Sequence, residues 1–186
     1  MQQGRPARPP ATSMPQSSAV LPGDSSGQTD PPHAIRTWLA GAHDLPAQAR
    51  TEWAAHRVAL LSLGRRFAAV RIPGVIIHAA VGTDDRQAVA DTVGAQVRGP
   101  VIHDVCAVGP TYWALVPWHP GSHWSGTTEI SYLGPVTYLG VPDLGCTEPP
   151  GPYWVTPPRH CRDLCHPETV LDLIVRGGHR LRHEPP

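Results

Sequence analysis

The chain has 186 residues, 40% of them hydrophobic, and its 15 basic residues balance 15 acidic ones, so its formal net charge is zero. This length and composition are typical of one domain with its own apolar core, and they do not indicate a uniformly basic nucleic-acid-binding protein. The four cysteines are too few for a disulfide scaffold, and no apolar stretch approaches the roughly 20 residues needed to span a bilayer. We therefore expect reduced cysteines and a cytoplasmic location.

The charges are unevenly distributed along the chain. Residues 33–75 contain six arginines against two acids, whereas residues 76–156 contain seven acids against two arginines. Lysine and asparagine are absent, which indicates a GC-rich bacterial genome and means that arginine had no competitor as the basic residue. The basic segment predicts either a local basic patch or an ordinary solvated face. The candidate residues are Arg57, Arg65, Arg66 and Arg71.

The N-terminal segment differs in composition from the rest of the chain. Residues 1–32 contain seven prolines, several Ser, Gly and Gln residues and almost no apolar periodicity, so we expect a disordered tail. Residues 33–186 are expected to form a single domain. Apolar residues at helical spacing predict a short helix that ends at Gly41, and Pro46 opens a second helix.

The next segment changes from helical to extended patterns. Continuous apolar runs at residues 58–63 and 67–72, each closed by glycine or proline, predict two neighbouring strands. A short helix is expected over residues 75–81. Residues 84–97 predict an amphipathic helix with acids in its first turn, where they complement the helix dipole.

The second half of the chain is rich in short strands bounded by glycine or proline. We expect strands at residues 101–105, 111–116, 130–133, 136–141 and 153–155. A last helix is expected over residues 167–175, with Gly177 and Gly178 as its stop. The order of these elements predicts an α/β (α+β) fold, a two-layer sandwich with a mixed or antiparallel sheet and flanking helices.

Residues 160–166 place four soft metal ligands within seven positions. These ligands are His160, Cys161, Cys165 and His166, which makes them zinc candidates. Zinc sites use separated ligand pairs, however, and no Cys-x-x-Cys knuckle occurs here. The alternative interpretation is ordinary buried cysteines and surface histidines at the start of a helix.

A histidine and an acid are adjacent in the predicted strand at residues 101–105. Successive residues of a strand point to opposite faces, so His103 and Asp104 cannot share a site without a bulge. We therefore interpret His103 as a hydrogen-bonded or solvated histidine and predict no catalytic pair here.

Aromatic residues concentrate in the strand-rich half, where they either pack a sheet or stack on bases. They are Tyr112, Trp113, Trp118, Trp124, Tyr132, Tyr138, Tyr153 and Trp154. The sequence contains no Walker loop, no Gly-x-Gly-x-x-Gly, no Gly-x-Ser-x-Gly elbow and no His-Glu-x-x-His motif. The common nucleotide-dependent and hydrolytic classes therefore gain no support, and no catalytic residue is predicted.

Four segments, taken in order, resemble the N-terminal domain of bifunctional DNA primase/polymerases. They are residues 63–74, 109–117, 133–141 and 153–158, within a region of about residues 58–158. In that family an early strand ends in an Asp-x-Asp pair, a later strand carries a Gly-Gly-x-His-type motif ending in Val-Pro, and a further strand precedes a Pro-Pro turn. The resemblance implies that Arg71 and Pro73 stand at the Asp-x-Asp positions and Thr111 at the nucleotide-contacting histidine.

The polymerase chemistry of that family uses carboxylates to hold Mg²⁺ or Mn²⁺ against a triphosphate. Neither Arg71 nor Pro73 can replace a carboxylate, and the third acidic position falls near residues 137–138. The resemblance therefore implies a degenerate member that retains the sheet, lacks the metal site and needs no cofactor. As a hypothesis, Arg65, Arg66 and Arg71 border an anion-accepting cleft.

Three functions follow as hypotheses. The first is a non-catalytic, primase/polymerase-like accessory or regulatory protein that binds nucleic acid or a nucleotide through the sheet face. The second is a protein-interaction domain of a bacterial regulatory system, with that face covered by helices and the tail recruiting a partner. The third is an active nucleotidyltransferase that uses Mg²⁺ or Mn²⁺ on displaced acids, with Asp84, Asp85 and Asp104 as candidates. No membrane partner is expected.

Overall fold

The computed structural model describes residues 1, 31–106, 109–119 and 130–183. The predicted disordered tail of residues 1–32 and Trp124 therefore lie outside the described residues, except for Met1, Pro31 and Pro32. The two prolines form the first turn of helix α1 (Pro31–Ala40), which begins two residues before the expected start of order.

The chain forms an α+β fold, as predicted. The elements after α1 are α2 (Pro46–His56), β1 (Val58–Ser62), β2 (Ala68–Pro73), α3 (Gly74–Val81), α4 (Arg86–Val97), β3 (Val101–Cys106), β4 (Gly109–Val116), β5 (Ser131–Leu133), β6 (Tyr138–Pro142), β7 (Tyr153–Thr156) and α5 (Pro167–His183). Five strands form an antiparallel sheet in the order β5-β2-β4-β3-β7, and β1 pairs with β6 in a second, two-stranded antiparallel sheet.

The prediction that the strands of residues 58–63 and 67–72 are neighbours is wrong. β1 pairs with β6, whereas β2 pairs with β4 and β5. The intervening turn separates them, because Gly64 adopts a left-handed φ of 84° and its N–H donates to the Phe67 carbonyl at 2.7 Å. Phe67 is then fully buried, and the chain passes from one sheet into the other.

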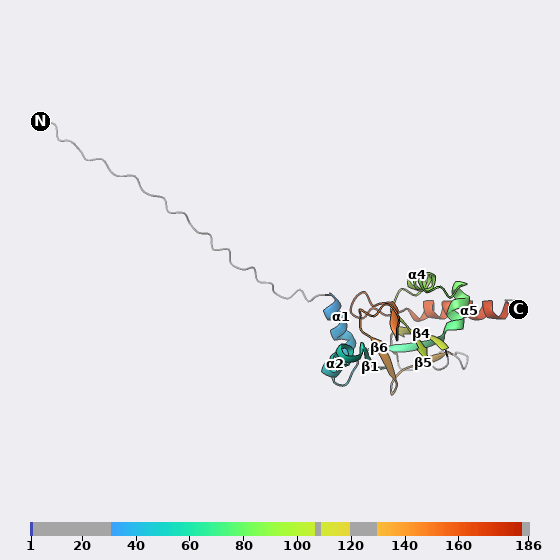
Figure 1. The fold of residues 1–186 in the computed structure, drawn as a ribbon, viewed down its shortest axis with the longest axis horizontal. Helices are drawn as coiled ribbons and strands as arrows, with labels where there is room; N and C mark the ends of the chain where they lie inside the picture. Colours follow the sequence, from blue (N-terminus) through green and yellow to red (C-terminus); the bar gives the residue numbers. More distant parts are fainter. Residues whose placement is uncertain (2–30, 107–108, 120–129, 184–186) are drawn as a thin grey trace.

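The two faces of the five-stranded sheet are covered differently. On the helix face, side chains such as Val70, Ile72 and Ala114 pack with α3, α4 and α5 in one core cluster. On the small-sheet face, Ala69 and Leu115 pack with α1, α2 and the β1-β6 sheet in another. In Figure 1, α1, α2, β1 and β6 lie together at one side of the domain, and α4 and α5 lie on the other. The small-sheet face is therefore covered over part of its length.

Polar contacts near the end of β6 join the small sheet to its neighbours. The Trp53 indole N–H donates to the Val141 carbonyl at 2.9 Å, and that of Trp154 donates to the Pro142 carbonyl at 3.1 Å. The Arg36 guanidinium donates two hydrogen bonds to Asp143, at 2.7 and 2.8 Å. These hydrogen bonds from Arg36 lower the pKa of the Asp143 carboxyl, which stays charged between α1 and β6.

Helix α5 does not stop at Gly177 and Gly178, and that prediction is wrong. The helix continues to His183. Gly177 is buried where α5 crosses α3, and a Cβ at this position would clash with the Ile76 carbonyl oxygen. The glycine therefore serves a close approach between two helices and not a helix end. Within the described ranges, no helix is long and apolar enough to cross a membrane.

Candidate functional site

Arg71 lies on β2, between β5 and β4 of the five-stranded sheet, on the small-sheet face. Alternation along β2 places it beside Ala69, and it pairs with Trp113 of β4 on one side and with Ser131 of β5 on the other. Its side chain is half-buried. Among the described residues, no carboxylate lies within ion-pair distance of the Arg71 guanidinium and no acceptor lies within hydrogen-bond distance. The protein thus holds an uncompensated cation on a partly covered sheet face.

Trp113 and Thr111 lie next to Arg71 on the same face of β4. Trp113 is half-buried and packs against the core of the small-sheet face. Thr111 pairs with Pro73 and is only 1% exposed, and its hydroxyl donates to the Gly109 carbonyl at 3.3 Å. The structure therefore brings Arg71 and Thr111 to one face of adjoining strands, but Thr111 is buried, whereas Arg71 and Trp113 are partly accessible to a ligand.

The other arginines of the basic segment lie elsewhere. Arg65 and Arg66 occupy the turn before β2, where Arg65 pairs with Asp44 at 2.6 Å and Arg66 donates to the Gly41 carbonyl at 3.5 Å. Arg66 is separated from Arg71 by up to about 16 Å of extended chain. Arg57 caps the C-terminal end of α2 and donates to the Cys146 sulfur at 3.2 Å. These arginines do not gather around Arg71.

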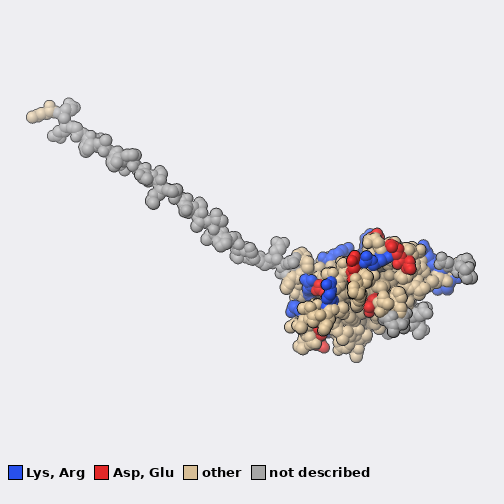
Figure 2. All heavy atoms as spheres, in the orientation of Figure 1, with Lys and Arg blue, Asp and Glu red and all other residues tan. Residues whose placement is uncertain are grey.

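The surface charge is mixed. On the face seen in Figure 2, arginines and acids lie interspersed, and no single basic area covers it. A nucleic-acid interface of the uniformly basic kind is therefore not present on that face. An anion site on that face therefore has to be local.

The candidate acids do not converge. Asp104 lies on the small-sheet face of β3, because its neighbour His103 packs on the helix face. Asp85 is the N-cap of α4 and accepts from the Ala88 N–H at 2.9 Å, and Asp84 acts electrostatically on His78 on the helix face. The sheet separates Asp104 from Asp84. Within the part of the chain that the structure describes, no three metal-ligating side chains gather.

The four zinc candidates are not arranged around one point. Cys165 is fully buried and its thiol donates to the Pro100 carbonyl at 3.3 Å, and burial raises the pKa of that thiol. Cys161, His160 and His166 are exposed, and Nδ1 of His160 lies 3.0 Å from the Cys161 carbonyl oxygen. The described geometry matches buried and surface residues near the start of α5.

A polar aromatic cluster that the sequence did not indicate lies on the helix face. His103 pairs across the sheet with Tyr112 and Tyr153, with ring centroids 4.8 and 5.0 Å away, and Nε2 of His78 lies 3.0 Å from the Tyr112 hydroxyl. Nδ1 of His103 is buried and has no hydrogen-bond partner among the described residues. The interpretation of His103 as fully hydrogen-bonded or solvated is therefore wrong for this nitrogen.

Burial controls protonation in this cluster. Desolvation lowers the pKa of both His78 and His103, and the nearby Asp84 and Asp104 oppose it only in part. Desolvation also raises the pKa of Tyr112 and Tyr153. All four groups are consequently neutral near pH 7. The short connection between the predicted strands at residues 101–105 and 111–116 is a signal from which the His103–Tyr112 pairing could have been predicted.

The chain matches no protein-family model, no curated protein and no solved structure.

Proposed function

We propose that the chain is a non-catalytic, primase/polymerase-like accessory or regulatory protein of the cytoplasm. It binds nucleic acid or a nucleotide on the small-sheet face, at Arg71 and Trp113. The observation that carries the proposal is the half-buried Arg71 residue, whose guanidinium has no charged or hydrogen-bonding partner among the described residues.

An uncompensated guanidinium on a partly covered face favours an anionic ligand. Desolvation of a charge is unfavourable unless the charge is paired, and a phosphate accepts two parallel hydrogen bonds from arginine. Trp113, directly opposite on the next strand, offers a ring on which a base can stack, an interaction of about 1–3 kcal/mol per base. The pair therefore suits a phosphate followed by a base.

The same residues support the absence of polymerase chemistry. A cation at position 71 repels the divalent metal that the carboxylates of the resembled family would hold. Asp104 lies on the same face but two strands away, with β4 between β3 and β2. Binding without catalysis is the function that fits these positions.

A binding assay with two matched variants tests the proposal. Fluorescence anisotropy of a labelled single-stranded oligonucleotide, and competition by a nucleoside triphosphate, would be measured for the wild type, Arg71→Gln and Arg50→Gln. Arg50 is exposed on α2 and undergoes the same change of charge. Loss of a charge-assisted hydrogen bond predicts a roughly 10-fold or larger weakening for Arg71→Gln and none for Arg50→Gln. Equal affinities in the folded variants would refute the proposal.

The exposed face of the small sheet favours the protein-interaction function as a second candidate. Leu60 and Tyr138 project outward from β1 and β6 and are 54% and 55% exposed, and Val136 before β6 is 96% exposed. Neighbouring exposed apolar side chains are typical of protein contacts. Binding of a protein partner that Leu60→Asp abolishes and Arg71→Gln leaves unchanged would support this function.

A further inference from the structure

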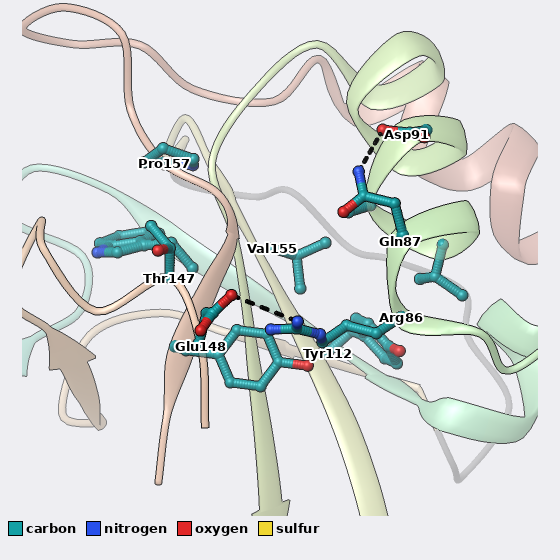
Figure 3. A pocket seen from close by; sticks show the side chains of 12 residues that line it. Arg86, Gln87, Asp91, Tyr112, Thr147, Glu148, Val155 and Pro157 are labelled. Carbon is teal, nitrogen blue, oxygen red and sulfur yellow. Dashed lines mark hydrogen bonds and ion pairs between the residues drawn. The ribbon is translucent and has the colours of Figure 1, made fainter. Parts of the chain in front are cut away.

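A pocket of about 350 Å³ lies on the helix face, between the start of α4 and strand β7. Tyr112, Tyr153 and Val155 line its sheet side, and the exposed Arg86 and Glu148 stand at its mouth. Figure 3 shows Arg86 and Glu148 facing each other. Pockets of this size accommodate small ligands, and aromatic walls with a few polar groups are typical of them. The pocket is separate from Arg71, because Arg71 lies on the opposite face of the sheet.

Arg86 and Glu148 are held together only loosely. Their side chains meet at 3.4 Å and are 50% and 71% exposed. An exposed ion pair of this kind contributes about 0–1 kcal/mol, so a ligand can share or replace it at little cost. In Figure 3 the Arg86 side chain reaches across the pocket from α4 toward Glu148. The mouth thus presents hydrogen-bond donors directly beside acceptors.

Three of the other polar side chains of the wall already have hydrogen-bond partners. The Gln87 amide donates to Asp91 at 2.9 Å along α4. Tyr112 has a hydrogen bond with His78, 3.0 Å away. The groups that remain to select a ligand are the Arg86 guanidinium and the Glu148 carboxylate at the mouth, together with the hydroxyls of Thr147 and Tyr153 in the wall.

We propose that this pocket binds a guanine base through Arg86 and Glu148. Arginine donors match the O6 and N7 acceptors of guanine, and a carboxylate accepts from the N1–H and N2–H donors on the adjoining edge. A guanidinium and a carboxylate placed side by side therefore complement the one common base whose acceptors and donors adjoin in this order. Adenine lacks the N1–H and turns its amino group toward the arginine.

Calorimetric titration with free nucleosides tests the proposal. We expect saturable binding of guanosine, about 10-fold weaker binding of inosine, which lacks the N2 amino group, and still weaker binding of adenosine and cytidine. Arg86→Gln and Glu148→Gln should each weaken guanosine binding by about 10-fold or more. The matched change Glu168→Gln, at an exposed acid of α5 outside the pocket, should leave it unchanged.

Three results would overturn the proposal: no guanosine binding, equal affinities for guanosine and adenosine, or binding that both pocket variants leave intact. Arg71→Gln should bind guanosine normally, so failure of this site and failure of the proposed function are distinguishable. Competition by a thymine oligonucleotide with one guanine identifies the source of the base. Displacement of guanosine supports a base within a strand, and lack of displacement supports a free ligand.

Discussion

Replacing Gly177 by alanine should lower the free energy of unfolding, because Gly177 lies at the contact between α5 and α3. An alanine is favoured over glycine inside a helix by about 1 kcal/mol. The added Cβ would clash with the Ile76 carbonyl, which belongs to helical backbone and cannot move alone. Overpacking of this kind costs about 3 kcal/mol, the upper end of the usual range. The expected net loss in the free energy of unfolding is about 2 kcal/mol, or roughly 4–8 °C in Tm.

The neighbouring glycine provides the matched control. A Cβ at Gly178 would approach nothing closer than the end of the Arg182 side chain, at 3.5 Å, which is ordinary contact. Gly178→Ala should therefore stabilise the protein by up to about 1 kcal/mol. Urea unfolding of the two variants measures both values. Equal effects at the two positions, or a stabilising Gly177→Ala, would refute the close-packing explanation of why α5 continues through both glycines.

Two further predictions concern the start of α4 and the half-buried histidines His78 and His103. Asp85→Ala should lower the free energy of unfolding by about 1 kcal/mol because the Ala88 N–H loses its hydrogen-bond acceptor. In thermal unfolding, the control variant Asp85→Asn should keep this stability, because asparagine also caps helices. The lowered pKa values of His78 and His103 mean that, just below their ordinary value of 6.5, the unfolded chain binds more protons than the folded one. The contribution of these histidines to stability is therefore complete above about pH 6.5 and falls as the pH drops below this value. His103→Phe should flatten this pH dependence in Tm measurements. A wild-type Tm that does not change with pH across this range would contradict the prediction.

Local patterns were sufficient to predict most helices and strands, because periodicity and glycine or proline boundaries act over a few residues. The division into two sheets was not predictable in this way. β1 pairs with β6, and its pairing partners lie about eighty residues later in the chain, so no signal near β1 could identify them. The same limit explains why β1 and β2 were expected to be neighbours.

Single residues show the same limit. Gly177 was interpreted as a helix stop because the reason for it, the Ile76 carbonyl, lies on another helix. Arg86 and Glu148 are 62 positions apart and meet only through the packing of α4 beside β7. Arg71 was a candidate from its strand and its resemblance to a site position, but its lack of a partner among the described residues emerges only from the packed sheet.

The salt dependence of single-strand binding by the wild type and Arg71→Gln tests the central claim most directly. Each phosphate contact on a single strand contributes about 0.7 to the slope of log affinity against log salt concentration. If Arg71 contacts a phosphate, the slope of the variant should be smaller by about that amount, while Arg50→Gln keeps the slope of the wild type. Identical slopes for the wild type and Arg71→Gln, or no salt-dependent binding by the wild type, would contradict the account.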